Sequence, residues 1–307
     1  FITTMPSFPY LAALLIACVT FLVYLPALHN GFVNWDDDSY VYNNTNIRIV
    51  GFDFFRWSLS AEVASLWHPL TLFSLALDYA SWGLNPFGYH LTNISLHALN
   101  TFLVFILAVR LTRQGINKNE YKTSLIVGCV TSFLFGLHPL HVESVAWISE
   151  RKDVLSAFFY LLTILIYVRY ISRNSKKSIY YFFSLFFFIM ALMSKPMAVT
   201  LPIVLLILDL YPFNRLVRGK ELKGVLIEKL PFFISSVAAS LLTLWATSIG
   251  GAARKLEAIP FLERIFVAAN SYIFYLVKMV FPFNLAPLYS YPVGIDPFAL
   301  RYSGAIA

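Results

Sequence analysis

Long runs of apolar residues, separated by short polar stretches, follow one another along nearly the whole chain. A helix needs about 20 apolar residues to cross the hydrocarbon core of a bilayer, within a range of roughly 17–25. Two neighbouring runs near residue 195 are together too long for one crossing and are predicted to form a helical hairpin. The pattern as a whole predicts eight membrane spans, at residues 10–28, 87–111, 121–137, 154–171, 179–194, 196–211, 230–249 and 265–281.

Composition supports a membrane protein and argues against a nucleic-acid-binding one. Hydrophobic residues make up 59% of the 307 residues and charged residues only 13%, whereas soluble domains are usually about 45–50% apolar and about 25% charged. The net charge of +7 does not come from one basic patch, because the lysines and arginines cluster between apolar runs. Both cysteines, Cys18 and Cys129, fall inside predicted spans and are interpreted as small core residues.

The first polar segment (residues 30–69) follows the first span and mixes polar with aromatic residues, including a short amphipathic piece at 53–59. The next stretch, 70–82, is apolar but too short to span, and it contains Asp78. It is predicted to be an interfacial or re-entrant helix. The loops after the second, fourth and sixth spans carry more lysine and arginine than the opposite loops. The positive-inside preference therefore predicts a cytoplasmic N-terminus and places residues 30–69 outside.

The densest candidate chemistry in this segment is the acidic run Asp36, Asp37 and Asp38. Three adjacent carboxylates repel one another, which favours a proton on one of them unless a cation compensates. Such a group is suited to act as a general base on a hydroxyl, or to hold a divalent ion. The alternative is a solvated loop cap.

A second group of candidates brackets the next outer loop. His138, His141 and Glu143 have a loose zinc-ligand spacing, with helix capping and an ion-pair network as the alternatives. Farther along are Glu150 and Asp153. Between those two acids, Arg151 and Lys152 could recognise a phosphate, Arg through its fork of donors and Lys as a point charge.

Lys195 lies at the outer tip of the predicted helical hairpin. An ionisable group at membrane depth is costly and is therefore a functional candidate. It could meet a lipid phosphate, or it could extend to the interface without a specific partner. His68, just before the interfacial helix, is a weaker candidate of the same kind.

These motifs carry a resemblance to a known family over nearly the whole chain. The sequence resembles the membrane half of bacterial tetratricopeptide-repeat glycosyltransferases. It is similar to the eukaryotic transmembrane O-mannosyltransferases that carry such repeats, and more distantly to other GT-C enzymes. The motifs that carry the resemblance are GFVNWDDDSYV at 31–41, WHPLT at 67–71, NPFGYHLTN at 85–93, HPLHVESVAWISERKD at 138–153 and MSKP at 193–196.

The resemblance implies a single GT-C-like transmembrane domain over residues 1–307, with interfacial helices in the first outer loop. It also implies an acidic pair in that loop, which corresponds to Asp36 and Asp37, with Asp38 as an additional neighbour. The family pattern favours Asp36 as the base, although three consecutive aspartates allow the register to shift by one. Family members usually continue into tetratricopeptide repeats, so the sequence is expected to be part of a longer protein.

The implied activity is inverting transfer of a sugar, with mannose as one candidate, from a polyprenyl-phosphate donor. The acceptor would be a protein or glycan hydroxyl outside a bacterial inner membrane. Lys195, Arg151, Lys152 and His68 are predicted to bind the donor phosphate, whereas the use of a divalent metal stays open. A transporter or lipid flippase would instead carry ionisable residues along mid-span helix faces. A non-catalytic membrane anchor would tolerate aspartate substitution without effect.

Overall fold

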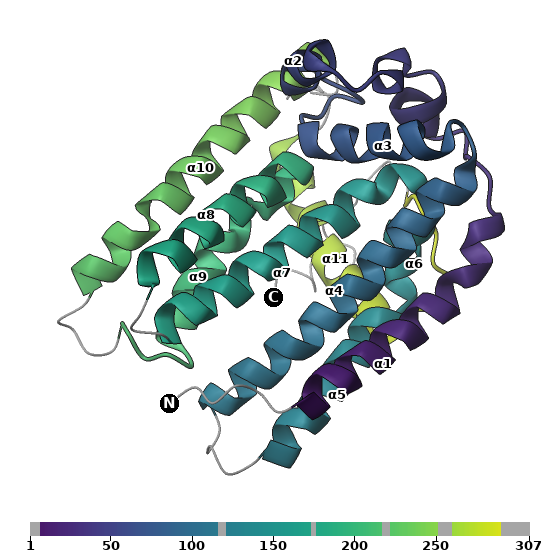
Figure 1. Cartoon of the computed structure of the whole chain (residues 1–307). Helices are drawn as coiled ribbons and strands as arrows, with labels where there is room; N and C mark the ends of the chain where they lie inside the picture. Colours follow the sequence, from purple (N-terminus) through teal and green to yellow (C-terminus); the bar gives the residue numbers. More distant parts are fainter. Residues whose placement is uncertain (1–6, 116–120, 173–175, 217–221, 251–259, 290–307) are drawn as a thin grey trace. The chain divides into compact units, whose positions relative to one another are not determined.

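The computed structural model describes residues 7–115, 121–172, 176–216, 222–250 and 260–289, and it is drawn in Figure 1. Over these residues the regular structure is helical, with one isolated bridge between Val63 and Leu66. It divides into two compact units, Phe1–Gly250 and Gly251–Ala307. The predicted all-α architecture is confirmed.

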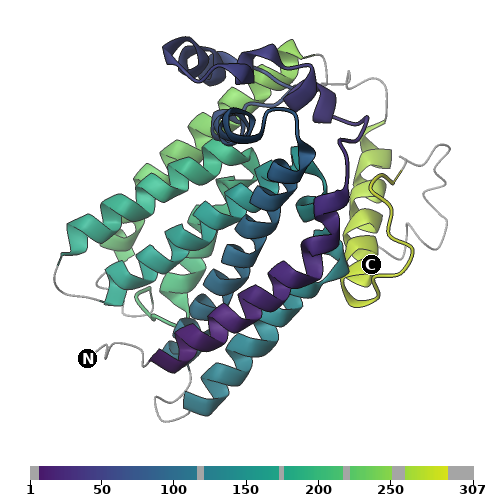
Figure 2. The same ribbon diagram turned by 45° about the vertical axis from the view of Figure 1, so that its right-hand side comes forward.

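The first unit is a bundle of long helices. In chain order they are α1 (Ser7–Tyr24), α4 (Pro86–Gly115), α5 (Tyr121–Leu137), α7 (Arg151–Ser172), α8 (Lys177–Ser194) and α10 (Leu222–Ile249). The packed neighbours include α1 with α4, α4 with both α5 and α7, and α7 with α8. Figures 1 and 2 show α1, α4 and α5 side by side, with α7, α8 and α10 continuing the row.

Five helical stretches among the described residues are long and apolar enough to cross a membrane. The number rises to six if α5 and the segment Pro139–Ala146, which meet at a bend of 47°, form one broken span. The chain is therefore an integral membrane protein with several spans. The five stretches are Phe8–His29, Pro86–Gly115, Ile148–Ser172, Lys177–Ser194 and Leu222–Ile249.

Even when α5 and the segment after it are counted as one span, two of the eight predicted spans do not qualify. The predicted sixth consists of η6 (Pro196–Thr200) and α9 (Leu201–Leu210). These two pieces have 5 and 10 residues, fewer than the roughly 17 that a crossing requires. The predicted eighth, α11 (Phe261–Val280), has 20 residues but carries Glu263, Arg264 and Lys278 within them. Helix α11 is therefore long enough to cross a membrane, but its charged residues distinguish it from the five stretches that qualify.

The first polar segment folds into short helices at one end of the bundle. After η1 (Leu25–His29) come η2 (Asp38–Tyr42), η3 (Thr45–Arg48), α2 (Phe52–Ser60) and α3 (Pro69–Trp82). The helix predicted over residues 70–82 is thus present as α3, which lies across the ends of the longer helices (Figure 1). A separate apolar core holds this layer together, and it includes Tyr40, Ile47, Phe54, Leu72, Leu75 and Ile148.

Two asparagines of α4 fix the start of α7 and the segment before it. Asn93 donates to the backbone oxygen of Trp147 at 3.0 Å, and Asn100 donates to that of Val154 at 2.8 Å. The short elements η4 (Pro139–His141), α6 (Val142–Ala146) and η5 (Ile148–Glu150) connect α5 to α7. These bonds therefore hold the second predicted site loop against the bundle.

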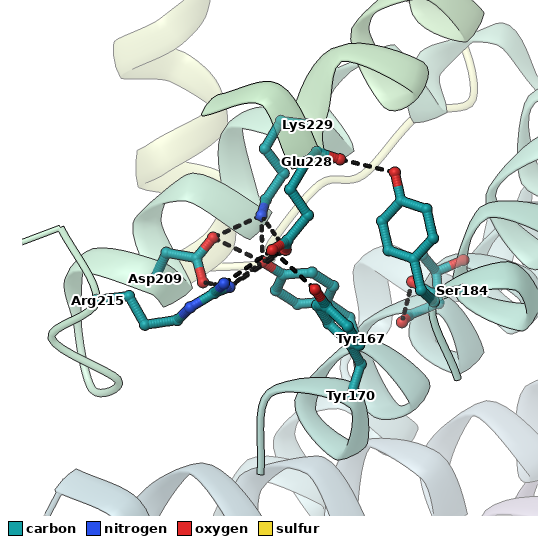
Figure 3. Close-up of polar contacts among 9 residues, drawn as sticks. Tyr167, Tyr170, Ser184, Asp209, Arg215, Glu228 and Lys229 are labelled. Carbon is teal, nitrogen blue, oxygen red and sulfur yellow. Dashed lines mark hydrogen bonds and ion pairs between the residues drawn. The ribbon is translucent and has the colours of Figure 1, made fainter. Parts of the chain in front are cut away.

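A buried ionic cluster, which we call the distal network, joins α7, α9 and α10 at the end of α7 opposite Arg151 (Figure 3). Lys229 pairs with Asp209 at 2.7 Å, and both side chains are fully buried. Arg215 bonds both carboxylates of the network at 2.8 Å. The span predicted at residues 230–249 left Lys229 in the basic loop before it. That boundary was wrong, because α10 begins at Leu222 and contains Lys229. The members are Tyr167, Tyr170, Asp209, Arg215, Glu228 and Lys229.

Candidate functional site

The three consecutive aspartates point to different places because of the backbone at Asp36. Its φ is 59°, in the left-handed region that aspartate adopts more readily than most residues. Asp37 is buried, with 1% of its surface exposed. The Asp36 side chain keeps 37% exposed. Asp38 bonds locally and accepts from the backbone nitrogen of Ser39 at 2.8 Å. Asp36 and Asp38 both stay partly exposed, and Asp36 faces the Lys152 ammonium at 4.0 Å.

Asp37 holds the first polar segment against η5. One carboxylate oxygen accepts from the backbone nitrogen of Val33 at 2.9 Å. The other accepts from the indole nitrogen of Trp147 at 3.1 Å and from the backbone nitrogen of Ser149 at 3.0 Å. The Ser149 hydroxyl donates to the same oxygen. Four donors compensate the buried carboxylate. Asp37 therefore connects the first polar segment to the segment before α7.

Asp36 begins a row of alternating charges, which we call the ion-pair chain (Asp36, Lys152, Glu150, Lys195 and Asp153). The Asp36 carboxylate lies 4.0 Å from the Lys152 ammonium, which lies 2.9 Å from Glu150. Glu150 also lies 3.6 Å from Lys195, and Lys195 contacts Asp153. Residues from η5, α7 and the α8–η6 junction thus meet the acidic run. The structure brings together five of the residues that the sequence singled out.

Lys195 lies between α8 and η6, and its side chain is one quarter exposed. Burial by itself lowers the pKa of this lysine, but the facing carboxylates of Asp153 and Glu150 more than offset it, so the pKa is raised. Lys195 therefore stays protonated at neutral pH. The preceding residue is held in place because its carbonyl oxygen accepts from the Thr71 hydroxyl of α3 at 2.9 Å.

A cavity of about 510 Å³ opens beside this lysine. Its polar lining includes Lys195, Asp153, Ser144 and His141, and the Ser144 hydroxyl donates to Asp153 at 2.9 Å. Most of the remaining lining is apolar and comes from α5, α7 and η6, including Phe135, Val154, Tyr160, Leu161 and Met197. The site therefore combines the Lys195 ammonium with a largely hydrophobic cavity between helices.

His68 is buried beside the ion-pair chain but offers it no charge. Its ring stacks on Tyr40 with the centroids 5.1 Å apart, and neither ring nitrogen has a hydrogen-bond partner within the described part of the chain. Burial, helped by the charges of Lys152 and Lys195, lowers the pKa of His68 to about 3. A neutral imidazole of this kind differs from the cationic phosphate ligand that the sequence suggested.

Arg151, which was predicted to bind the donor phosphate, instead makes contacts within the protein. Its side chain is fully buried and pairs with Asp78 at 2.6 Å. It donates to Ser74 at 2.7 Å, to the backbone oxygen of Tyr89 at 2.9 Å and to the side chain of Asn93. These contacts tie α3 and α4 to the start of α7. The guanidinium is thus committed to partners within the chain and does not line the cavity.

The predicted zinc ligands are only partly gathered. The rings of His138 and His141 lie 6.4 Å apart, and Glu143 is exposed. His138 accepts from the backbone nitrogen of Leu140 at 3.2 Å, as a helix cap does. Throughout the described ranges, no group of three His, Cys, Asp or Glu side chains is arranged to hold a metal ion. The capping alternative is the one observed at His138.

Two tryptophans at the site were not predicted to act in it. The rings of Trp35 and Trp147 lie 5.9 Å apart, and the Lys152 ammonium lies 5.9 Å from the Trp147 ring. The same ammonium lies 5.2 Å from the ring of Tyr40. The sequence showed Trp35 and Tyr40 only as neighbours of the acidic run. Nothing in it linked Trp147, more than 100 residues later, to the same place.

Comparison with known proteins finds relatives among the protein O-mannosyl-transferases. The protein O-mannosyl-transferase Tmtc1 of Drosophila melanogaster is 29% identical over 266 residues, which cover 83% of this chain. TMTC2 of Mus musculus, also a protein O-mannosyl-transferase, is 33% identical over 61% of this chain. The chain is similar in sequence to protein O-mannosyl-transferases. The predicted similarity to the eukaryotic transmembrane O-mannosyltransferases is thereby confirmed.

The chain spans only part of the protein O-mannosyl-transferases that it matches. The aligned region covers 29% of the Drosophila protein, 21% of the mouse protein and 26% of human TMTC1, which is 28% identical. No family model matches the chain, and no solved structure gives a significant match.

Proposed function

We propose that this chain is the catalytic membrane part of a glycosyltransferase that uses a sugar linked to polyprenyl phosphate. The observation that carries the proposal is the apolar cavity with Lys195 at its polar side, joined to Asp36 by the ion-pair chain. Hydrophobic walls suit an isoprenoid chain, and an ammonium suits its phosphate. The similarity to protein O-mannosyl-transferases supports mannose as the sugar and a protein hydroxyl as the acceptor.

In this proposal the lysines and Asp36 of the ion-pair chain have separate tasks. Lys195 would exchange its contacts with Asp153 and Glu150 for the donor phosphate, and Lys152 would add positive charge nearby. Asp36 would accept the proton of the acceptor hydroxyl as its oxygen attacks the anomeric carbon. The bond between that carbon and the phosphate oxygen breaks, its electrons remain on polyprenyl phosphate, and the configuration inverts. The lysines stabilise the departing charge.

Sidedness and context extend the proposal. The positive-inside preference favours an extracytoplasmic Asp36 and a cytoplasmic N-terminus, and a bacterial inner membrane is the compartment we propose. Tetratricopeptide repeats in a longer protein would present the acceptor.

The transporter alternative draws its support from the distal network, which holds ionisable groups within the helices. Those charges, however, pair with one another. Lys229 contacts Asp209 and Glu228, and Arg215 contacts both acids as well. None of the four lines the cavity beside Lys195. A charge-balanced cluster away from the cavity suits helix packing better than a transport path.

The test is transfer of labelled mannose from polyprenyl-phosphate mannose to acceptor protein in membranes that contain the full-length protein. We expect Lys195→Met to reduce transfer about 100-fold, because the phosphate loses its main cation. Lys177→Met, which removes an exposed lysine at the start of α8, should leave transfer unchanged. Absence of transfer by the wild type with mannose, glucose and N-acetylglucosamine donors would overturn the proposal.

A further inference from the structure

Trp35 and Trp147 form an aromatic pair directly beside the carboxylate that the proposal uses as a base. Trp35 precedes Asp36 in the chain, and 46% of its surface is exposed. Its ring lies 5.9 Å from that of Trp147, with 37° between the planes. A large aromatic surface is therefore open to solvent at the Asp36 end of the ion-pair chain.

The Trp147 ring of the pair is held rigidly. The indole nitrogen of Trp147 donates to Asp37 at 3.1 Å and to the backbone oxygen of Trp35 at 3.2 Å. Because Asp37 is itself fixed by the backbone nitrogens of Val33 and Ser149, the Trp147 ring cannot turn without breaking buried bonds. Rigid aromatic surfaces bind ligands with little loss of side-chain entropy.

The groups around the pair match the chemistry of a pyranose ring. One face of a hexose presents C–H groups, which pack against aromatic rings, while its hydroxyls bond charged groups at the ring edge. Here Lys152 lies 5.9 Å from the Trp147 ring and 4.0 Å from Asp36. An aromatic face, an ammonium and a carboxylate thus converge within a few ångströms of one another.

We propose that Trp35 and Trp147 form the platform that holds the transferred hexose of the donor. This inference rests on the proposed function, which requires the anomeric carbon to lie between a phosphate at Lys195 and the base at Asp36. The hexose must then occupy the stretch of the ion-pair chain that Lys152 and Trp147 border. Trp35 and Trp147 are positioning and specificity residues, and no bond is made or broken on them.

An exposed tryptophan in a membrane protein can also act as an interfacial anchor, and α10 supplies a matched control. Trp245 is 47% exposed, almost the same fraction as Trp35. It lies in the last turns of α10, which contributes no residue to the ion-pair chain. Leucine at either position keeps apolar surface but removes the flat ring.

The experiment measures the binding of two lipids to the purified full-length protein in nanodiscs, polyprenyl phosphate and polyprenyl-phosphate mannose. We expect Trp35→Leu to raise the Kd of the mannose lipid about fivefold, the scale of one aromatic packing contact. The Kd of the sugar-free lipid should stay within twofold. Trp35→Phe should retain most of the affinity, and Trp245→Leu should change neither Kd. Melting temperature confirms folding of each variant.

Several results would overturn the inference. Equal weakening of both lipids, or an equal effect of Trp245→Leu, would make Trp35 an anchor. No change in either Kd would remove it from donor binding. If wild-type protein binds the sugar-free lipid in a Lys195-dependent way but Trp35→Leu has no effect, only the platform fails. If the wild type binds neither lipid, the proposed function fails with it.

Discussion

Replacing Arg151 tests whether its buried contacts serve stability, as the geometry indicates, or phosphate binding, as the sequence suggested. Arg151→Met keeps most of the side-chain volume but leaves the Asp78 carboxylate, 2.6 Å away in the native pair and nearly buried, without its cation. Breaking a buried ion pair in this way costs about 3–5 kcal/mol. The hydrogen bonds to Ser74 and Asn93 are lost as well, so the cost should lie toward the upper end.

The assay is thermal unfolding of purified protein in one detergent, followed together with donor-lipid binding. A loss of this size lowers the melting temperature by on the order of 10 °C, by the scaling for soluble domains of 150–250 residues. The double variant Arg151→Met/Asp78→Leu should recover much of the loss, because removing both charges removes the unpaired carboxylate. Arg169→Met, a partly buried arginine of the same helix, is the control.

The opposite pattern would refute this reasoning. If Arg151→Met unfolds at the wild-type temperature and binds polyprenyl phosphate 10-fold more weakly or worse, then Arg151 is a phosphate ligand.

Two further predictions concern buried groups outside the proposed chemistry. The pKa of His68 is lowered to about 3, so below pH 6.5 the unfolded state binds a proton that the folded state does not. Stability should therefore fall by about 2 kcal/mol between pH 6.5 and 5, and His68→Phe should flatten that decline in a pH series of melting curves. Lys229→Met leaves Asp209 with Arg215 as its remaining cation and should lower the free energy of unfolding by about 3 kcal/mol, with an unchanged KM for the donor. The control Lys223→Met, at an exposed lysine of the same helix, should leave stability unchanged. An altered KM in Lys229→Met would tie the distal network to the site.

Much of the fold could be predicted from the hydrophobic pattern, because lipid-facing helices must be long and apolar. Helix α5 (Tyr121–Leu137) has the predicted bounds, and α3 begins one residue before the predicted interfacial segment. The segment after Lys195 was overestimated, since apolar composition alone does not show that η6 and α9 together stop short of a crossing. For α11, three charged residues outweigh an adequate length.

The site was predictable in its residue types but not in its pairings. Asp36, Lys152 and Lys195 were singled out from charge at the ends of apolar runs, and the structure places them in one row. The pairing of Arg151 with Asp78 joins positions 73 residues apart, and local sequence carries no record of such a contact. The different roles of Asp36 and Asp37 depend on a left-handed backbone conformation at Asp36, which three identical neighbours do not reveal.

The measurement that tests the account most directly is single-turnover mannose transfer by Asp36→Asn, Asp37→Asn and Asp38→Asn, each with its melting temperature. The account predicts that Asp36→Asn loses transfer by about 100-fold or more while it binds donor and unfolds as the wild type does. Asp37→Asn should lower the melting temperature, because an amide cannot accept from all four donors, and Asp38→Asn should change little. Undiminished transfer by Asp36→Asn, or a loss confined to Asp38→Asn, would contradict the assignment of the base.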